Sequence, residues 1–382
     1  MPPALRILQM GKFFPPDRGG IETVTRNISE MLTPLAIRAD VLCLGLEAEG
    51  DLDVGSYSVR RIRPQLVLGG NKALSTRYIT DVRAASARYD VGLLHMPNPL
   101  AALAALIGWR KPLVLLWHAD FSIAPLRAVG DRLDEWLIRR ADAVIAPTCV
   151  HLDSSRLADR MRSKSTVIPY PFTPGPAASE APSDLSRRVA RWADGRRVVL
   201  AVGRLVPYKG FDVLVDAAAK SAGNVAWVIV GDGPLQPDLT ARVARLGLGD
   251  RVLLTGGVSP DDMQRLIALA DFGCLPSVTA QEMYGMTQVE MMAAGKPMIS
   301  TDIPRSGVPC VNLHDTTGLI VPPRDATALA NAATHLANDR ALHARFSTGA
   351  AETFAAGHVS SQAARRYAEL LHRVAGKAQQ AI

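Results

Sequence analysis

The chain has 382 residues, of which 48% are hydrophobic, and its formal net charge at pH 7 is +7. This length exceeds one ordinary domain, and the apolar content is enough for large cores, so we expect two domains. The opening residues lack the apolar segment of a secretory signal, and the longest apolar run, residues 100–109, is too short to cross a bilayer. The aromatic residues are few and are not interleaved with basic ones, so we expect no nucleic-acid partner.

The positive charge is unevenly placed, because residues 1–172 carry five of the seven excess positive charges. A basic half could attract an anionic lipid or a diphosphate, or it could be an ordinary solvated surface. The four cysteines have no metal-ligand spacing, and Cys43 and Cys274 lie in apolar runs that are typical of buried thiols in a reducing compartment. We therefore expect a cytoplasmic protein, either free or peripheral on the inner face of the cytoplasmic membrane.

Short runs rich in β-branched residues alternate with helical patterns through the first half of the chain. We predict strands at residues 6–10, 40–44, 91–96, 113–117, 143–147 and 166–169, with helices that include residues 21–32 and 133–140. Residues 45–75 break this alternation, and no single structure is assigned to them. The alternation predicts a parallel sheet that is covered by helices on both faces.

The same alternation restarts after a stretch rich in proline, alanine and serine at residues 171–182. We predict strands at residues 198–202, 226–230, 252–255 and 272–275, and helices at residues 211–220, 239–246, 261–269 and 362–374. The predicted fold is therefore α/β, with two doubly wound domains in tandem. We expect domains at residues 1–172 and 187–358, a linker at 173–186, and a terminal helix within 359–382 that packs back on the first domain.

Two carboxylates eight positions apart, Glu282 and Glu290, stand out in the segment 281–297. The segment predicts a loop, a short helix that ends at Gly295, and a buried strand from Met298. Glu282 would then lie in the loop that faces the amino end of the helix, and Glu290 about one turn inside it. Both carboxylates could therefore contact a single ligand at that end.

The predicted helix also offers free amide groups at its start. The amides of Gly285, Met286 and Thr287 could meet an anion or the hydroxyls of a ligand. An alternative interpretation makes Glu290 purely structural, because Thr287 and Glu290 have the spacing of a capping box.

A basic loop framed by two glycines, Gly203 and Gly210, directly follows a predicted strand. In doubly wound sheets, ligands bind beyond the carboxyl ends of the strands, so this loop is a candidate site. The glycines let the backbone approach a ligand, and Arg204 and Lys209 offer positive charge to a phosphate. The loop is neither a P-loop nor a dinucleotide fingerprint, and an exposed basic loop without a ligand is the alternative.

Two further segments resemble known binding motifs. Residues 231–234 begin like a dinucleotide fingerprint but lack its third glycine, so a tight turn is the preferred interpretation. Asp51 and Asp53 have the spacing of a metal-binding Asp-x-Asp motif, but no predicted strand leads into them, and we assign no metal site.

In the first half, Gly19 and Gly20 join the first predicted strand to the first helix and would permit close approach to a ligand. His118 ends a strand, where the sheet topology favours function, although a lone histidine is often structural. His95 ends another strand, and we interpret it as part of the wall or core.

Assembled, these motifs resemble the retaining glycosyltransferases of family 4, which have the GT-B fold of two Rossmann-like doubly wound domains facing a cleft. The resemblance covers nearly the whole chain. It is most specific at Glu282-x7-Glu290 and at residues 203–210, and weaker at residues 231–234, 19–22 and 118–120.

The resemblance implies roles for particular residues. Arg204 and Lys209 would bind the donor diphosphate and do the work of a metal, so no metal or other cofactor is expected. Glu282 would contact donor-sugar hydroxyls, Glu290 the nucleotide ribose, and His118 would line the reacting sugar. The implied catalytic residues are His118, Arg204, Lys209 and Glu282. The implied donor-binding residues are Gly19, Gly20, Arg204, Lys209, Val258, Glu282, Tyr284, Gly285, Met286, Thr287 and Glu290.

The resemblance also implies a reaction. It favours transfer of mannose from GDP-mannose, with retention of configuration, to a lipid-linked or free saccharide acceptor in bacterial surface polysaccharide assembly. Tyr284 stands where the family usually has phenylalanine, which could alter how the donor fits. A UDP-sugar donor, a nucleotide-sugar epimerase, and a noncatalytic sugar-binding protein are the alternatives. An anionic membrane surface is a candidate partner, because the acceptor could be a lipid and the first half of the chain is basic.

Overall fold

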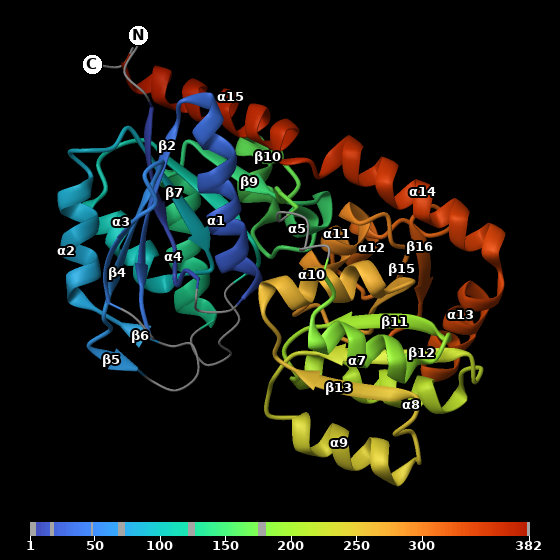
Figure 1. The fold of residues 1–382 in the computed structure, drawn as a ribbon. Coiled ribbons are helices and arrows are strands. Elements are labelled where there is room, and N and C mark those ends of the chain that lie inside the picture. Colours follow the sequence, from blue (N-terminus) through green and yellow to red (C-terminus); the bar gives the residue numbers. More distant parts are fainter. Residues whose placement is uncertain are drawn as a thin grey trace. The chain divides into compact units, whose positions relative to one another are not determined.

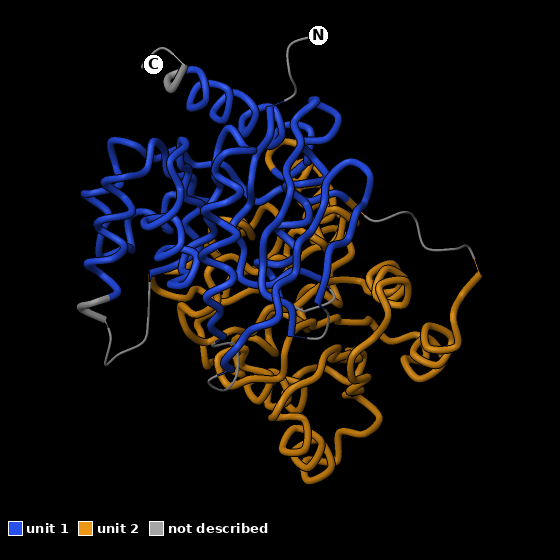
Figure 2. Tube along the Cα trace, turned by 90° about the vertical axis from the view of Figure 1, so that its left-hand side faces the viewer, with its two compact units in different colours: residues 1–173, 358–382 blue, residues 174–357 orange. Residues whose placement is uncertain are grey.

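A computed structural model describes residues 5–15, 19–46, 49–67, 73–120, 127–174 and 181–379. The chain divides into two compact units (Figure 2). Unit 1 comprises residues 1–173 and 358–382, so it contains both ends of the chain, and unit 2 comprises residues 174–357.

Unit 1 contains an eight-stranded sheet in the order β10-β9-β8-β7-β1-β2-β4-β3. All neighbouring strands are parallel except β3 and β4, which form an antiparallel pair at one edge. The strands are β1 (Arg6–Met10), β2 (Arg38–Leu44), β3 (Gly50–Asp53), β4 (Ser58–Ile62), β7 (Val91–Met96), β8 (Leu113–Trp117), β9 (Ala143–Ala146) and β10 (Ser165–Val167). A separate short pair, β5 (Leu66–Val67) and β6 (Ala73–Leu74), is antiparallel.

Helices cover both faces of this sheet (Figure 1). They are α1 (Gly20–Leu32), α2 (Thr76–Ala85), α3 (Pro99–Gly108), α4 (Arg127–Arg140), α5 (Cys149–Asp153), α6 (Ala158–Met161) and α15 (Ser360–Gln379), with 3-10 turns η1 (Thr33–Leu35) and η3 (Arg162–Lys164). Helices α2, α3 and α4 share one core with alternate residues of the strands, such as Leu94 and Leu115. Helix α15 packs beside α1, so the terminal helix folds back on the first sheet.

Unit 2 contains a six-stranded, entirely parallel sheet in the order β13-β12-β11-β14-β15-β16. The strands are β11 (Arg197–Val202), β12 (Val225–Val230), β13 (Val252–Gly256), β14 (Phe272–Leu275), β15 (Met298–Thr301) and β16 (Gly318–Val321). The helices are α7 (Asp184–Ala193), η4 (Pro207–Lys209), α8 (Phe211–Lys220), α9 (Gln236–Arg245), α10 (Pro260–Leu269), α11 (Met286–Ala293), α12 (Val308–Val311), α13 (Ala326–Asn338) and α14 (Arg340–Gly357).

The apolar residues of these strands face two separate cores, as expected for a parallel sheet covered on both sides. Helices α8, α9 and α13 pack on one face, around Trp227 and Phe272. Helices α7, α10 and α11 pack on the other face, around Val228 and Met298.

The predicted arrangement of two doubly wound α/β units is therefore confirmed, and the apolar strands lie within a few residues of their predicted bounds. Two expectations differ from the structure. Helix α7 begins at Asp184, inside the range 173–186 that was given to a linker. The described residues of the unassigned stretch 45–75 include four strands, of which β3 is exposed along its whole length and so has no apolar pattern to reveal it.

Each sheet has a point where the order of its strands reverses direction, and ligands bind beside such points in folds of this kind. In unit 1 the reversal lies at β1, between β7 and β2, and in unit 2 it lies at β11, between β14 and β12. The loops that follow these strands are therefore the places to look for a site.

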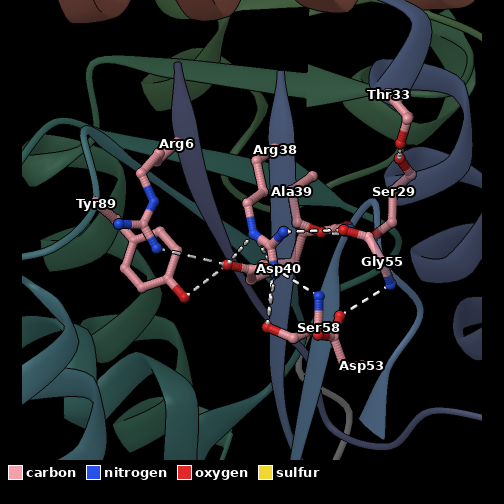
Figure 3. Close-up of polar contacts among 11 residues, drawn as sticks. Arg6, Ser29, Thr33, Arg38, Ala39, Asp40, Asp53, Gly55, Ser58 and Tyr89 are labelled. Atoms are coloured by element: carbon pink, nitrogen blue, oxygen red, sulfur yellow. Dashed lines mark hydrogen bonds and ion pairs between the residues drawn. The ribbon is translucent and has the colours of Figure 1, made fainter. Parts of the chain in front are cut away.

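A buried carboxylate, Asp40, lies near the amino end of β2, at the end of the unit 1 strands that is opposite to these loops (Figure 3). It accepts hydrogen bonds from the amide and hydroxyl of Ser58, from the Tyr89 hydroxyl at 2.9 Å and from the Arg38 guanidinium at 3.1 Å. Burial, followed by the charge of Asp40, raises the pKa of Tyr89 to about 12. Because Asp40 is surrounded by donors near the amino ends of its strands, we assign it to the fold rather than to a ligand.

Candidate functional site

In unit 2, two loops meet at the reversal point of the sheet. The loop after β11 runs from Gly203 to Gly210, and its Tyr208 carbonyl accepts a backbone hydrogen bond from Val278, in the loop after β14, at 2.8 Å. Gly210 has a φ of +67°, and a Cβ there would overlap the carbonyl oxygen of Pro276. Only glycine allows this close approach, so the sequence at this position fixes how the two loops pack.

The two loops bring Lys209 and Glu282 into direct contact. The Lys209 ammonium donates to Oε2 of Glu282, and only 14% and 11% of the two side chains are exposed. The Ser277 hydroxyl donates to the same carboxylate oxygen at 3.0 Å, and the Ser306 hydroxyl donates to the Glu282 carbonyl. One carboxylate oxygen and the backbone carbonyl of Glu282 are therefore both fixed by donors, in a place where an unpaired charge would be costly to bury.

Arg204 lies in the same loop but remains exposed to solvent. Its guanidinium lies 3.5 Å from the Tyr208 hydroxyl, and the Lys209 ammonium lies 5.7 Å from the centre of the Tyr208 ring. One fixed cation and one exposed cation thus flank an aromatic ring, which is an arrangement that can receive an anionic ligand.

Helix α11 follows this site and begins at Met286, with Gly285 as its N-cap at a φ of +74°. The capping-box hypothesis is therefore wrong, because Thr287 lies inside the helix instead of at its cap. Gln288 occupies the third helical position, and its side-chain amide donates to the Tyr284 carbonyl at 2.8 Å.

Glu290 lies about one turn inside α11, as the sequence predicted, and the structure shows that it is half-buried. Tyr284 is buried just before the helix. The first amides of α11, including those of Met286 and Thr287, have no acceptor within the helix. Together these features place two carboxylates and a helix amino end in one segment.

The segment 231–234 packs against the basic loop. A Cβ on Gly231 would overlap the Gly203 carbonyl, and the Leu205 amide donates to the Asp232 carbonyl at 2.9 Å. The Asp232 carboxylate in turn accepts from the amide of Gly257 at 2.8 Å, next to the half-buried Val258. The predicted close packing is thus confirmed, whereas the hydrogen-bonded turn spans residues 233–236, where the Gln236 amide donates to the Gly233 carbonyl at 3.1 Å.

In unit 1, Gly19 is the N-cap of α1 and Gly20 is its first residue. A Cβ on Gly19 would overlap the carboxylate of Glu22, whereas a Cβ on Gly20 would meet nothing within 4 Å. Residues 16–18, which precede these glycines, lie outside the described residues.

His118 follows β8 and is buried together with His95 of β7. His118 Nε2 lies 3.1 Å from His95 Nδ1, and His118 Nδ1 is hydrogen-bonded to the Tyr170 hydroxyl. Burial lowers the pKa of His95 to about 3 and that of His118 well below 6.5, so both rings are neutral near pH 7. Both nitrogens of the His118 ring thus have protein partners.

The structure brings Lys209 and Glu282 together within unit 2, and Arg204 and the start of α11 belong to the same pair of loops. His118, Gly19 and Gly20 lie in unit 1. Sequence analysis missed Ser277 and Ser306 as partners of Glu282, and it assigned His95 to the wall or core. Alternation of apolar residues carries no signal for such contacts, although the register that pairs Met96 with Trp117 does place the two histidines on neighbouring strands.

Comparison with known proteins agrees with this architecture. The family model "Glycosyltransferase Family 4" matches residues 18–174, and "Glycosyl transferases group 1" matches residues 183–353. The crystal structure of Anabaena Alr3699/HepE in complex with UDP and glucose superposes on this chain with a TM-score of 0.77. The two sequences are 23% identical, and the match covers 97% of this chain and 100% of that one. That likeness concerns the fold, which is GT-B.

Relatives of known activity are similar over most of their length. D-rhamnosyltransferase WbpZ of Pseudomonas aeruginosa is 32% identical, over 82% of this chain and 81% of its own. The GDP-mannose-dependent alpha-(1-6)-phosphatidylinositol monomannoside mannosyltransferase of Mycobacterium tuberculosis is 35% identical, over 88% and 90%. The O-antigen chain mannosyltransferase C of Escherichia coli is 28% identical, over 96% and 99%. The chain therefore belongs to family 4 of the glycosyltransferases, with a second unit of the group 1 type.

Proposed function

We propose that this glycosyltransferase moves mannose from GDP-mannose to a lipid-linked or oligosaccharide acceptor, with retention of configuration, in the assembly of a bacterial surface polysaccharide. The observation that carries the proposal is the Lys209–Glu282 pair at the reversal point of the unit 2 sheet. The choice of mannose is supported by the relatives, two of which are named as mannosyltransferases and one of which is named as GDP-mannose-dependent.

In this proposal Lys209 and Arg204 bind the donor diphosphate and stabilise the negative charge of the leaving nucleotide. Glu282 accepts hydrogen bonds from sugar hydroxyls, while the amides of Gly285, Met286 and Thr287 donate to them. Lys209 contributes twice, because it also compensates the charge of Glu282. Glu290 binds the ribose, and Val258 packs near the base.

In the proposed reaction the positive charge of Arg204 and Lys209 neutralises the diphosphate and does the work of a metal ion, so the proposal includes no metal. Retention is proposed to occur on one face of the sugar, with the leaving phosphate accepting the proton of the acceptor hydroxyl. Glu282 is tied to Lys209 and Ser277, which suits a hydrogen-bonding role better than that of an attacking nucleophile.

A UDP-sugar is the second candidate donor, because the structural neighbour HepE was solved with UDP and glucose. The purified protein would be given radiolabelled GDP-mannose, UDP-glucose or UDP-N-acetylglucosamine together with a polyprenyl-diphosphate-linked saccharide. We expect transfer from GDP-mannose to give an α-linked product by NMR. Transfer only from a UDP-sugar would overturn the choice of donor, and a β-linked product would overturn retention.

We also propose that the α3–α4 surface of unit 1 contacts an anionic membrane that carries the acceptor. Trp136 of α4 is 58% exposed and lines a surface hollow with Arg110, Arg139 and Arg140. A basic group near an anionic surface contributes about 1 kcal/mol, and an aromatic ring suits the interface. No helix among the described residues is long and apolar enough to span a bilayer.

Two other basic segments of unit 1, around Arg60 and around Arg156, fit this role less well. Arg60 pairs with Asp81 at 2.9 Å, and Arg156 pairs with Asp131. Arg139 and Arg140 are also paired, with Glu135 at 3.6 Å and with Asp142 at 3.7 Å. The exposed ring of Trp136, rather than unpaired charge, therefore favours the α3–α4 surface.

Co-sedimentation with phosphatidylglycerol and phosphatidylcholine vesicles tests the surface. Trp136→Ala should weaken binding to phosphatidylglycerol, whereas Leu246→Ala, at an exposed apolar residue of unit 2, should not. Equal binding to both lipids, or an unchanged Trp136→Ala variant, would contradict the proposal.

A further inference from the structure

A continuous series of buried hydrogen bonds runs through unit 1, from the segment after β10 to strand β2. It passes through the side chains of Tyr170, His118, His95, Gln9 and Ser29, and each of them is buried. The series crosses β1, where the strand order of the sheet reverses.

The far end of the series fixes the orientation of Gln9. Its side-chain nitrogen lies 3.0 Å from the Thr25 carbonyl oxygen, which can only accept a hydrogen bond. The same nitrogen lies 2.7 Å from the Ser29 hydroxyl, whose own hydrogen is donated to the Ala39 carbonyl at 2.7 Å (Figure 3). Gln9 must therefore direct its oxygen, and not its nitrogen, towards His95.

The orientation of Gln9 determines which nitrogen of His95 carries the hydrogen. Oε1 of Gln9 lies 3.0 Å from His95 Nε2 and cannot donate, so Nε2 is the protonated nitrogen. Nδ1 of the neutral ring is then an acceptor. The Thr25 hydroxyl lies 3.5 Å from Nδ1 but donates to the Ile21 carbonyl at 2.9 Å, so it does not supply a hydrogen to Nδ1.

The same reasoning extends to His118. Its Nε2 lies 3.1 Å from the accepting Nδ1 of His95, so His118 carries its hydrogen on Nε2. Its Nδ1 is left as an acceptor, and the Tyr170 hydroxyl donates to it. Both rings are neutral, because burial lowers the pKa values of His95 and His118. Burial also lowers the pKa values of the nearby His151 and His358.

We propose that Gln9 and His95 are positioning residues that hold His118 as the neutral Nε2–H tautomer, with Nδ1 presented as an acceptor to a hydroxyl group. In this structure the hydroxyl is that of Tyr170. The extension to a sugar hydroxyl during transfer rests on the proposed function, whereas the tautomer does not. A fixed acceptor at the carboxyl end of β8 favours a hydroxyl over a group that can only accept.

Nitrogen-15 labelling of the histidines of the full-length protein tests the tautomer directly, since long-range proton–nitrogen spectra distinguish the two ring nitrogens. We expect His118 and His95 to be neutral Nε2–H tautomers between about pH 5 and pH 8. A wild-type spectrum in which His118 carries its hydrogen on Nδ1 would overturn the proposal. The His95→Gln and Tyr170→Phe variants assign the signals.

The variant Gln9→Glu provides the sharper test, because it changes the far end of the series without touching His118. A carboxylate beside His95 Nε2 should raise the pKa of His95. Once protonated, His95 would donate from Nδ1, and His118 would have to accept on Nε2, so its hydrogen would move to Nδ1. If the nitrogen-15 signals of His118 do not change while His95 is charged, the proposal is contradicted. Gln9→Met, which removes the acceptor without adding charge, is the matched control and should leave His95 neutral.

Kinetics supply a second readout. We expect Gln9→Glu to lower kcat about tenfold at pH values where His95 is protonated, with KM for the acceptor little changed and recovery at higher pH. A loss of kcat that does not depend on pH would indicate a structural defect and contradict the positioning role of Gln9 and His95. If the wild-type protein shows the expected tautomers but transfers no sugar, the proposed function fails and the proposed tautomer of His118 stands. If it transfers sugar but His118 is the other tautomer, the positioning proposal fails and the proposed function stands.

Discussion

Each unit places a buried polar cluster at the reversal point of its parallel sheet, but the two clusters solve the problem of burial differently. In unit 1, His118 and His95 are neutral and pass hydrogen bonds along a series. In unit 2, Lys209 and Glu282 form an ion pair, and the Ser277 hydroxyl donates to the same carboxylate oxygen as Lys209. A neutral series offers a directed lone pair, whereas a compensated pair offers charge to an anion or a hydroxyl.

The difference follows from the residue types and from burial. At pH 7 imidazole is already mostly neutral, because the pH lies above its ordinary pKa of about 6.5, so burial leaves it uncharged at little cost. A lysine and a glutamate that face each other gain more by staying charged, provided that hydrogen bonds satisfy the remaining lone pairs. The same sheet topology therefore supports two different chemistries.

The largest effect is expected from Glu282→Ala. It should lower kcat/KM for sugar transfer by on the order of 100-fold or more, because it removes the contact to donor hydroxyls and leaves Lys209 uncompensated. Glu282→Gln keeps the shape and an acceptor for Ser277 but loses the charge, so it separates the two contributions. Transfer at the wild-type rate in Glu282→Ala would show that the ion pair is structural only.

Gly210→Ala should destabilise unit 2 by roughly 2–4 kcal/mol in urea unfolding, since a Cβ there would overlap the Pro276 carbonyl as well as adopting a φ of +67°. Gly195→Ala is the matched control. Gly195 has a φ of +73° with nothing within 4 Å of a Cβ, so only about 1 kcal/mol is expected. Equal losses would mean that the close approach of the two loops contributes little.

The histidines of unit 1 make its stability depend on pH. The folded pKa of His95, about 3, lies below the value near 6.5 of the unfolded chain, so the unfolded state binds more protons at acidic pH. The stability is complete above about pH 6.5 and falls as the pH decreases towards 3. Chemical denaturation at several pH values measures how the free energy of unfolding changes with pH. Between about pH 5.5 and pH 4, His95→Gln should lower the slope of this dependence by roughly 1.4 kcal/mol per pH unit. Equal slopes in the two proteins would contradict a neutral His95.

The smallest effect is expected from Thr287→Ala. Because Gly285 is the N-cap of α11, Thr287 does not cap the helix, and the free energy of unfolding should change by about 0.5 kcal/mol or less. A loss of about 1 kcal/mol or more would restore the capping-box interpretation and make Glu290 structural.

The fold was predictable where apolar runs recorded it. Strands such as β7 and β8 are buried along their whole length, and their residue pattern shows this. Strand β3 is exposed throughout, so its pattern carries no such signal. The glycine at position 285 also places the start of α11 two residues earlier than the Thr287 capping box required.

The site was predictable in part, because the topological rule directs attention to the loops after particular strands. It singled out Lys209, and the spacing of two carboxylates singled out Glu282, but their contact depends on how Gly210 packs against Pro276. His95 was interpreted as core, and it is buried, but its hydrogen bonds to Gln9 and His118 join three different strands or strand ends. Contacts of that kind leave no periodic pattern in the sequence.

The account rests most heavily on Lys209 and Glu282 forming part of a nucleotide-sugar site. Thermal-shift measurements with GDP, UDP, GDP-mannose and UDP-glucose test this, because a ligand that binds only the folded state stabilises it. At a concentration about 100-fold above the dissociation constant, GDP-mannose should stabilise the wild-type protein by about 2.7 kcal/mol. The shift should be retained in the exposed-lysine control Lys220→Met and lost in Lys209→Met. No shift with any nucleotide, or an equal shift in Lys209→Met, would contradict the account.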